Sequence, residues 1–556
     1  MRKLILSLVI LASFSMRALA YDFQSGELLY TIISTNPPQV SLDGHVDGTE
    51  AQGDIIIPES VIFDDVAYNV SAIKQFAFYH CTGITSIAIG QYVETIGKQC
   101  FEGCTGLTGN LIIPNSVVQI EDCAFYDCTG LDGNLVLSEN LTEIRTSVFR
   151  NCGFTGNLVI PEGIRIIGSS AFWGCDFTGD LAIPNSVIII NDLAFYNCSS
   201  FDGQLLIGSS VTTIGASAFS GCSGLTGDLV IPNSVVFVYT AAFRGCSGLN
   251  GNITLSLNLR EIGRCAFQDC SNLSGDLIIP NGVNEIGWLA FKNCIGLNGR
   301  LEIPNTIWKI ESGTFQSCSF SSLLLGDYIT EIHYWAFKDL STLNTITIKA
   351  KTPPSFIETD VYGAFENVPN NIPLFVPCGT LETYQNADGW SEFTNIHEGV
   401  TDLLLVLSSD ETAGMVRTLK EPTCEDRMVE VEAEPYEGWA FAYWEANGER
   451  VSGDNPYNFE LVEDTELVAY FSETGLNEME QLFKVFPNPA QDQLHLQYSP
   501  DVQPKQIELY DLQGRLVRSQ GNAFETFDLG KLPAGTYTLR VAMEDGQVFS
   551  DKVVKE

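Results

Sequence analysis

The 556-residue chain is poor in the residues that most active sites and nucleic-acid interfaces require. It has five scattered histidines, which are His45, His80, His333, His397 and His495. It has no His-Glu-x-x-His motif, no Gly-x-Ser-x-Gly elbow, no P-loop and no dinucleotide fingerprint. Paired Cys-x2-Cys or histidine clusters are also absent, which argues against a bound metal. We therefore expect no catalytic residues, no cofactor and no metal, and we expect that the protein is not an enzyme.

Basic residues are scarce as well. The chain has 29 Lys and Arg against 69 Asp and Glu, so its formal charge is 29 − 69 = −40. An acidic surface of this kind repels nucleic acid and anionic lipid, and a duplex-binding surface needs clustered Lys and Arg. We exclude nucleic acid as a partner, and we interpret the acidity as typical of a soluble protein outside the cell.

The longest apolar run lies at the start of the chain. Arg2 and Lys3 precede an apolar stretch from Leu4 to Phe14, and Ala18-Leu19-Ala20 supplies a small-x-small cleavage site. We expect residues 1–20 to be a signal peptide that is cleaved after Ala20. No later stretch has the roughly 20 apolar residues that a membrane helix needs, so we expect export without a transmembrane helix.

What the sequence has in abundance is one repeated unit. The stretch from Gly109 to Cys128 reads GNLIIPNSVVQIEDCAFYDC, and variants of it recur every 22 to 24 residues. The aligned phenylalanines are Phe78, Phe101, Phe125, Phe149, Phe172, Phe195, Phe219, Phe243, Phe267, Phe291, Phe315 and Phe337. Eleven of these twelve are followed three residues later by Cys, and the twelfth by Leu340. Units this short cannot bury their own apolar face, so twelve copies predict a stacked solenoid.

A single rung illustrates the expected packing. Its Leu-x-Ile alternation predicts a short parallel strand, and Pro114 ends that strand because proline has no backbone donor. A glycine before the strand suits a corner with positive φ, as at Gly109, Gly133, Gly156 and Gly179. We expect an inward-facing core of Leu111, Ile113, Val117, Ile120, Ala124, Phe125, Cys128 and Leu131. At about 4.8 Å per rung, twelve rungs make a rod or arc roughly 55–60 Å long.

The repeat also resembles a known family. The string Leu-x-Ile-Pro-x-x-Val-x-x-Ile-Gly-x-x-Ala-Phe-x-x-Cys, seen in Leu229–Cys246 and Leu277–Cys294, is similar to the BspA-like leucine-rich repeats of bacterial surface proteins. The resemblance covers about half of the chain. It implies a mainly β protein with a right-handed leucine-rich-repeat solenoid of about 12 rungs, and attachment to host or neighbouring-cell molecules at the cell surface. The repeat by itself predicts only a large rigid surface.

Sixteen cysteines in an exported chain raise the question of disulfides. Cysteines at equivalent positions on adjacent rungs point in parallel directions, whereas a disulfide needs converging Cβ vectors. Leu340 in the same slot indicates that the slot takes a compact apolar group, and a buried thiol behaves as one. We expect the eleven ladder cysteines, from Cys81 to Cys318, to form a buried thiol column. The pairing of the others stays open, and these are Cys100, Cys123, Cys265, Cys378 and Cys424.

Two columns of outward side chains are candidate binding surfaces. The first follows each repeat phenylalanine by one position, and its candidate contacts are Tyr79, Tyr126, Arg150, Trp173, Tyr196 and Arg244. Exposed Tyr, Trp and Arg are frequent interface anchors, but the same rings can instead cover the apolar edge of the next rung. The second column lies at the middle of each strand and comprises Ile112, Val136, Val159, Ala182, Leu206, Val230, Thr254 and Ile278. An exposed apolar column marks a binding face, whereas a covered one only supports the β stack, and the sequence leaves both open.

The repeats occupy residues 76–349, and the segments on either side of them are interpreted as caps. Residues 21–75 contain short strand signals, and the acidic stretch Asp43–Gly48 is expected to be a turn because it lacks the later acidic ligand of a calcium loop. Residues 350–400 contain a last strand and a segment with Trp390 that is expected to fold over the open end. Such atypical ends close the core of a solenoid.

Residues 401–473 change in character and alternate like strands, with Asn447-Gly448 as a hairpin turn. The string Gly438–Trp444, together with Asn455-Pro456-Tyr457, resembles a divergent internalin-type B-repeat, which implies a small β-rich spacer module. We expect Trp439 and Trp444 to be core residues, although stacking on a sugar is the alternative.

Residues 474–484 are interpreted as a linker, and residues 485–556 show the pattern of a compact β-sandwich. The motif residues here are Pro487, Asn488, Pro489, Asp511, Gly514, Gly535, Lys552 and Lys555. They resemble the C-terminal sorting domain of type IX secretion. The resemblance implies contact with the secretion machinery, export across the inner and outer membranes, and in many members attachment to surface lipopolysaccharide.

Taken together, these features favour a secreted or cell-surface adhesin that binds an extracellular protein or glycan through its solenoid. The alternative is a structural component of a surface coat. A carbohydrate- or peptide-processing enzyme is a remote alternative, because a glycosidase needs two carboxylates across a cleft and no rung carries an insertion that would build one.

Overall fold

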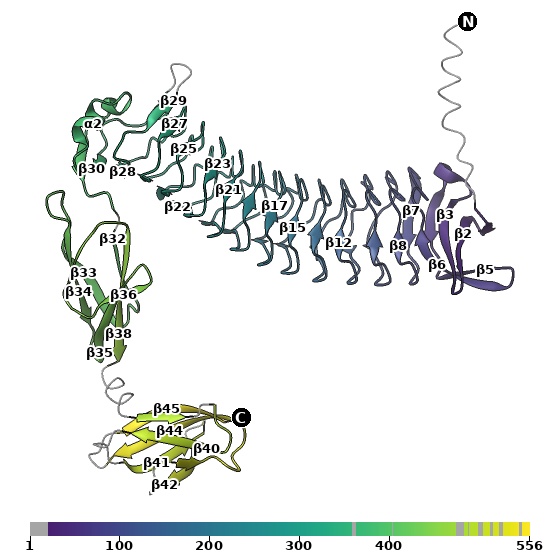
Figure 1. Ribbon diagram of the computed structural model, residues 1–556. Coiled ribbons are helices and arrows are strands. Elements are labelled where there is room, and N and C mark those ends of the chain that lie inside the picture. The colour runs from purple at the N-terminus through teal and green to yellow at the C-terminus, as the bar shows by residue number, and fades with distance from the viewer. Residues whose placement is uncertain are drawn as a thin grey trace. The chain divides into compact units, whose positions relative to one another are not determined.

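The structure is a computed structural model, and it describes residues 21–357, 363–402, 404–473, 483–486, 489–498, 504–511, 515–521, 526–543 and 548–555. The chain divides into two compact parts, Met1–Thr401 and Asp402–Glu556 (Figure 1). The fold is mainly β, as expected, and helix is confined in the described residues to short segments. The expected signal peptide, most of the expected linker, and Pro487, Asn488 and Gly514 lie outside the described residues.

A small sheet closes the N-terminal end of the solenoid. Its strands are β1 (Phe23–Ser25), β2 (Leu28–Thr35), β3 (Pro38–His45), β5 (Ser60–Phe63) and β6 (Val66–Ile73). The first three pair antiparallel, and β3 then pairs parallel with β6, against which β5 lies antiparallel. Because β6 also pairs in parallel with the first rung strand β8 (Thr95–Ile96), the cap and the solenoid share one sheet.

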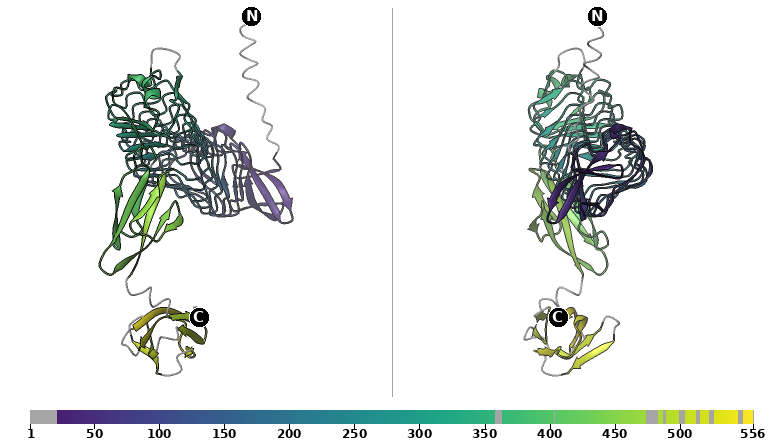
Figure 2. Two further views of the ribbon diagram at one scale, coloured as in Figure 1. Left: turned by 60° about the vertical axis from the view of Figure 1, so that its left-hand side comes forward. Right: turned by 90° about the vertical axis from the view of Figure 1, so that its right-hand side faces the viewer.

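Nearly every rung contributes a strand to each of two columns of short parallel strands (Figures 1 and 2). The first column, called the strand face here, consists of β4 (Gln52–Ile56), β7 (Gly83–Ala88), β9 (Leu111–Ile112), β11 (Leu135–Val136), β14 (Leu181–Ala182), β16 (Leu205–Leu206), β18 (Leu229–Val230), β20 (Ile253–Thr254), β22 (Leu277–Ile278), β24 (Arg300–Ile303), β26 (Ser322–Leu325), β28 (Thr345–Ile348), β30 (Leu374–Pro377) and β31 (Ile396–Gly399). The second column consists of β8, β10 (Gln119–Ile120), β12 (Glu143–Ile144), β13 (Ile166–Ile167), β15 (Ile189–Ile190), β17 (Thr213–Ile214), β19 (Phe237–Val238), β21 (Glu261–Ile262), β23 (Glu285–Ile286), β25 (Lys309–Ile310), β27 (Glu331–His333) and β29 (Ser355–Ile357). The pairing is in register from rung to rung, as between Leu111 and Leu135.

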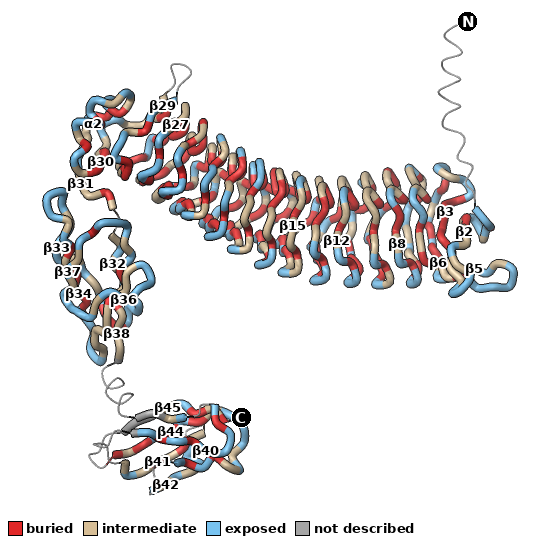
Figure 3. Tube along the Cα trace, in the orientation of Figure 1, coloured by how far each residue is buried: buried red, intermediate tan, exposed pale blue. Residues whose placement is uncertain are grey.

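The core of the solenoid is a continuous apolar column, drawn in red in Figure 3. All eight side chains that the sequence placed inward on the model rung, from Leu111 to Leu131, are buried, which confirms that prediction. The repeat phenylalanines stack face to face from Phe78 to Phe365, with successive ring centroids 5.0–5.8 Å apart. Offset stacking of this kind adds to the free energy gained by burying each ring.

The ladder cysteines form the expected column of buried free thiols. From Cys104 to Cys318, each thiol donates a hydrogen bond to the carbonyl oxygen of the phenylalanine on the preceding rung, with Sγ···O distances of 3.0–3.1 Å. The side chain in this slot is therefore a hydrogen-bond donor as well as a compact apolar group. The donor role was not visible in the sequence. Cys100, Cys123 and Cys265 are also free, whereas Cys378 and Cys424 are disulfide-bonded.

Two polar ladders explain the Pro-Asn-Ser motif. The side-chain oxygen of Asn115, Asn185 or Asn233 accepts the backbone N–H at the equivalent position of the next rung, at 2.8–3.0 Å. The serine hydroxyl of the motif donates to a valine or isoleucine carbonyl of the previous rung, as Ser116 does to Val93 at 2.7 Å. These bonds satisfy backbone groups at the corner, where no strand partner is available.

Several sequence-based expectations need correction. Gly133 does not adopt positive φ, unlike Gly109, Gly156 and Gly179. An added Cβ at Gly133 would lie 2.5 Å from the backbone of Gly109, so close packing requires the glycine. The rung at residues 157–160 has no assigned strand, contrary to the expectation of one on every rung. The second strand column was not anticipated.

The acidic stretch at the N-terminal cap also differs from the prediction. Asp43 belongs to β3 and is buried, because it accepts hydrogen bonds from Thr31 and Ser41 and pairs with Lys74 at 2.9 Å. The turn begins only at Val46. The expectation of a turn at Asp43 is wrong because a buried aspartate whose hydrogen-bond partners are distant in sequence has the same local pattern as a turn residue.

The C-terminal end of the solenoid is closed by a short helix and two further strands. β30 was expected to be the last strand, but β31 continues the strand face in parallel beyond it. Helix α2 (Leu381–Gln385) and the 3-10 turn η2 (Trp390–Glu392) lie over the end of the core (Figure 1). The Trp390 ring is buried, and its Nε1 donates to the Pro354 carbonyl at 2.8 Å.

The second part begins with a β module built from two sheets. One sheet has the order β32 (Leu404–Ser408), β38 (Thr465–Glu473), β35 (Trp439–Ala446) and β36 (Glu449–Ser452), and the other has β33 (Gly414–Lys420), β34 (Met428–Pro435) and β37 (Tyr457–Glu460). The hairpin turn at Asn447-Gly448 is confirmed, since both residues have positive φ. Trp444 is a core residue as expected, while Trp439 is half-buried.

The C-terminal segment forms two antiparallel sheets around its own core. Their strands are β39 (Phe483–Phe486), β40 (Gln493–Tyr498) and β43 (Thr526–Asp528) in one sheet, and β42 (Leu516–Gln520), β41 (Pro504–Tyr510), β44 (Gly535–Met543) and β45 (Val548–Lys555) in the other. Buried side chains from both sheets, among them Leu494, Ile507 and Leu539, meet in one cluster. This is the β-sandwich arrangement that the sequence predicted.

Candidate functional site

The strand face carries a row of ten exposed side chains, nine of which are apolar and one of which is a threonine. The row, which we call the stripe, comprises Ile56, Ala88, Ile112, Val136, Val159, Ala182, Leu206, Val230, Thr254 and Ile278. It contains the column considered in the sequence and extends it by two rungs toward the N-terminus. Exposure is high, at 60% for Ile112, 67% for Val159 and 50% for Ile278. The stripe is therefore open to solvent rather than covered by the corner.

The position of the stripe follows from strand geometry. Successive side chains of a strand point to opposite faces, so the residues on either side of each stripe position, such as Leu111 and Ile113, point into the core. Where two rungs pair in parallel and in register, a stripe residue lies directly beside its counterpart on the next rung, as in the pairs Ile112–Val136, Ala182–Leu206 and Val230–Thr254. The stripe ends at Glu302, which occupies the same position and pairs with Arg300 at 2.9 Å.

A shallow hollow interrupts the stripe near its middle. It is lined by strand-face residues of three successive rungs, among them Val159, Ala182 and Leu206, and its volume is about 460 Å³. The short side chain of Ala182 creates the dip between its larger neighbours. A single bulky side chain of a partner would fit this hollow.

Carboxylates border the stripe, and basic side chains do not. Within five residues of the ten stripe positions the sequence has no Lys or Arg and nine Asp or Glu, which are Asp54, Glu59, Asp132, Glu139, Glu162, Asp180, Asp202, Asp228 and Asp276. All nine are exposed. Hydrogen bonds from Ser86 and Thr85 lower the pKa of Asp54, which keeps this group ionised. The strand face is thus apolar along its centre and negative along its edges.

The column after the repeat phenylalanines has a different character. Arg150 lies between two rings, with its guanidinium carbon 3.9 Å from the centroid of Trp173 and 5.3 Å from that of Tyr126. Tyr196 packs on Trp173 at 4.6 Å. The four side chains are half-buried, and Arg150 Nε is buried without a hydrogen-bond partner. The structure therefore brings these four candidate residues together.

The other two candidates of this column stand apart from the cluster. Tyr79 is half-buried and contacts Phe76 and His80 edge to face, and Arg244 is exposed seven rungs further along. In the cluster itself, each ring contacts another side chain of the column. This packing favours a structural role for the rings.

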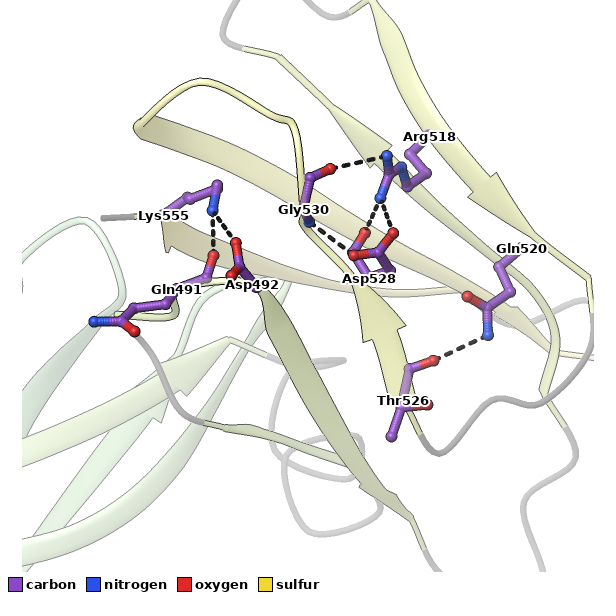
Figure 4. A network of polar contacts seen from close by, with 8 residues as sticks. All are labelled: Gln491, Asp492, Arg518, Gln520, Thr526, Asp528, Gly530 and Lys555. Carbon is purple, nitrogen blue, oxygen red and sulfur yellow. Dashed lines mark hydrogen bonds and ion pairs between the residues drawn. The ribbon is translucent and has the colours of Figure 1, made fainter.

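In the C-terminal segment, polar contacts link residues that lie apart in the sequence (Figure 4). The buried Lys555 ammonium donates to the Gln491 carbonyl and pairs with Asp492 at 3.3 Å. Ala490, next to Pro489 of the expected motif, forms a parallel bridge with Lys555. The two ends of the motif, 66 residues apart in sequence (Pro489 to Lys555), are therefore brought close together.

The remaining described motif residues form turns and strand ends. Asp511 accepts the Arg515 backbone N–H at 3.0 Å and its guanidinium at 2.8 Å across the expected turn. Gly535 begins β44, and Lys552 lies in β45. Beside them, Arg518 bonds Asp528 at 2.8 Å and the Gly530 carbonyl at 3.1 Å. These contacts stabilise the domain and show no chemistry of their own.

The described residues offer neither a metal site nor a membrane-spanning helix. No cluster of three or more His, Cys, Asp or Glu with the geometry to hold a metal ion occurs among them. None of their helices has the length and apolar character to cross a bilayer.

The fold and these surfaces define a leucine-rich-repeat solenoid joined to two small β domains. The family description "BspA type Leucine rich repeat region" matches six copies over residues 71–202, 166–298 and 274–372, which together cover more than half of the chain. The chain belongs to the BspA-type leucine-rich-repeat family. The "Secretion system C-terminal sorting domain" matches residues 484–556. This domain marks the protein for type IX secretion to the cell surface.

Several solved structures have similar chains, and some of these are leucine-rich-repeat proteins. One from Bacteroides ovatus is 22% identical, with 68% of this chain and 100% of that chain covered and a TM-score of 0.44. A leucine-rich cell surface protein from Faecalibacterium prausnitzii is 20% identical, with 68% and 98% covered and a TM-score of 0.40. The pneumococcal vaccine antigen PcpA is 18% identical, with 67% and 97% covered and a TM-score of 0.33. The comparison with curated proteins gives no match.

Proposed function

We propose that this cell-surface protein is an adhesin that binds an extracellular protein or glycan through the strand face of its solenoid. The observation that supports this function is the exposed stripe. Single exposed apolar residues are ordinary, but a contiguous apolar patch on a soluble protein usually marks an interaction site. The stripe extends over ten rungs on a rigid, stacked core, so a ligand meets a surface that is already ordered.

The stripe fits this role better than the cluster around Arg150. The side chains of the cluster are half-buried because they pack on one another. The stripe side chains are exposed and remain available to a ligand. A partner that covers the stripe removes apolar area from water, which is the main source of affinity in most protein associations. The sorting domain supports the same function, because it delivers the solenoid to the outside of the cell.

The surface-coat alternative is less well supported at this face. Two copies that paired stripe to stripe would bring two sets of nine carboxylates together, and like charges across an interface cost free energy. The enzyme alternative has no built site in the described residues. We expect no turnover of glycans or peptides by this protein.

The test is a glycan and extracellular-matrix array probed with the chain from Tyr21 onward. The stripe variant carries Val136→Thr, Val159→Thr, Leu206→Thr and Val230→Thr, and the natural Thr254 shows that the position tolerates threonine. The matched control variant carries Tyr79→Ala, Tyr126→Ala, Trp173→Ala and Tyr196→Ala in the other column. Circular dichroism melting checks that both variants stay folded.

We expect the wild type and the aromatic variant to bind the same spots, and the stripe variant to lose them. Loss in the aromatic variant alone would transfer the site to the column after the phenylalanines. Absence of saturable binding by the wild type would refute the adhesin function and favour self-association, which sedimentation velocity measures.

A further inference from the structure

We propose that the segment bound on the stripe is a cationic amphipathic polypeptide, and this inference rests on the proposed function. Its basis is the arrangement of charge beside the apolar row, since nine exposed carboxylates and no basic side chain accompany ten stripe positions. A ligand that covers the apolar centre must also face these edges. Positive side chains flanking an apolar face complement both features at once.

Basic residues are absent from the stripe segments but present on the other faces of the same rungs. Between Cys104 and Gly299 the basic residues are Arg145, Arg150, Arg165, Arg244, Arg260, Arg264 and Lys292, and every one lies outside the strand-face segments. Arg150, Arg244 and Lys292 follow repeat phenylalanines, and the other four lie at or next to the second strand column or in the turn after it. Along the stripe the chain thus places its cations on the other faces, and the first basic side chain of the strand face is Arg300 in β24, one rung beyond the last stripe position.

Backbone contacts hold several of these carboxylates in place. One oxygen of Asp180, Asp228 and Asp276 accepts, at 2.7 Å, the backbone N–H of the residue 24 positions later, which directly precedes or begins the strand of the next rung. Asn110 makes the same contact on an earlier rung at 2.8 Å, so the bond itself does not require a charge. The aspartates therefore contribute a negative charge at a fixed place beside the stripe.

The dimensions suit a long helix. Ten stripe positions at about 4.8 Å per rung span roughly 43 Å, and a helix with a rise of about 1.5 Å per residue covers that length in about 29 residues. Amphipathic helices bind apolar surfaces through one face and can flank it with Lys or Arg. The hollow at Ala182 would receive one large apolar side chain of such a helix.

Other ligand classes fit the face less well. The stripe contains no aromatic side chain for stacking on a sugar ring. An anionic glycan or a second copy of this chain would meet the same nine carboxylates and be repelled. A neutral apolar segment would leave the charged borders without a partner.

The experiment uses the chain from Tyr21 onward and three synthetic 28-residue peptides with a fluorescent label. The first is a Leu/Lys sequence with an amphipathic helical pattern, the second replaces every Lys by Glu, and the third scrambles the Leu/Lys order. Fluorescence anisotropy gives the dissociation constants at 50 and 500 mM NaCl.

Two protein variants separate charge from apolar contact. The charge variant carries Asp180→Asn, Asp228→Asn and Asp276→Asn, which keeps the backbone contact as Asn110 does, together with Glu139→Gln and Glu162→Gln. The apolar variant is the four-threonine protein described above. Neither removes a buried side chain, so both are expected to melt within a few degrees of the wild type.

We expect the Leu/Lys helix to bind the wild type at least about tenfold more tightly than the scrambled peptide and about a hundredfold more tightly than the Leu/Glu peptide, with affinity falling about tenfold at high salt. Each variant should weaken binding about tenfold or more. Equal affinity for the ordered and scrambled peptides would overturn the inference, as would unchanged affinity in the charge variant.

The result on the array keeps the two proposals apart. Stripe-dependent array binding that is insensitive to salt and to the charge variant would overturn the cationic ligand and leave the adhesin function standing. Stripe-dependent capture of the Leu/Lys helix without any array ligand would support the cationic ligand and refute the adhesin function.

Discussion

The ladder thiols should resist alkylation for as long as the solenoid is folded. The perturbation is iodoacetamide at pH 8, applied to the native chain without denaturant. Two features protect these thiols: each lies in the core, and each from Cys104 to Cys318 donates its hydrogen to a phenylalanine carbonyl. Alkylation requires the thiolate, so it needs both access and loss of that proton.

The size of the effect follows from the pKa values. Burial raises the pKa of Cys198 to about 12. At pH 8 a thiol with the ordinary pKa of about 9 is roughly a tenth ionised, whereas one at about 12 is ionised in about one molecule in ten thousand, a ratio of about 900. Steric exclusion from the core slows the reaction further, so modification should proceed through local opening or unfolding.

The assay is mass spectrometry of peptides after timed labelling. Cys123, which is half-buried and outside the ladder, should react first and serves as the internal reference. A second sample labelled in 6 M guanidinium chloride should react at all fourteen free cysteines within the same time. The ratio of native to denatured rates then gives the protection of each rung.

One result would refute the reasoning directly. If the ladder peptides labelled in the native state as fast as the peptide containing Cys123, the thiols would be neither buried nor hydrogen-bonded. Recovery of ladder cysteines as disulfides under non-reducing conditions would refute it equally, because the parallel side chains would then have converged.

Three further predictions concern stability. Burial raises the pKa of Cys81 to about 11 and of Cys198 to about 12. The stability that these thiols contribute is therefore complete below the unfolded-state pKa of about 9, and it is lost as the pH rises toward the folded-state pKa values. Circular dichroism should show alkaline unfolding above pH 9, and a melting temperature unchanged from pH 8 to pH 11 would contradict this. Phe219→Ala, which removes a ring stacked at 5.3–5.4 Å on both sides, should lower the free energy of unfolding in urea by about 3–5 kcal/mol, with Phe219→Leu costing less, and equal losses would argue against stacking. Asn185→Ala should cost about 1 kcal/mol because the Ser209 N–H loses its acceptor, whereas Asn185→Asp, which keeps the oxygen, should be nearly neutral in the same urea titration.

The core of the solenoid could be predicted from the sequence because a repeat multiplies one pattern. Leu111, Val117, Phe125 and Cys128 each recur at a fixed spacing, so a single assignment of the inward face places dozens of side chains. The second strand column escaped prediction because most of its strands are only two residues long and lie outside the Leu-x-Ile segment in which alternation is visible. Asp43 was misread because its hydrogen-bond partners Thr31 and Lys74 are distant in sequence.

In contrast to the core, the binding surface could not be chosen from the sequence. Both outward columns could be written down from the repeat, but their residue types did not indicate which one faces solvent. Aromatic Trp173 looked like the stronger anchor, yet it packs on Arg150 and Tyr196. The plain aliphatic Val159 turned out to be among the most exposed apolar residues of the solenoid.

The sequence alone determined that this protein is an exported stack of rungs with a phenylalanine and thiol core, because every rung repeats the same inward pattern and a short unit can bury it only against its neighbours. Only the tertiary structure decided which outward column is open. At a strand position the side chain projects away from the sheet, and an in-register neighbour lies beside it rather than over it. At the position after each phenylalanine the chain turns, so long side chains such as Arg150 and Trp173 lie against adjacent rungs and cover one another.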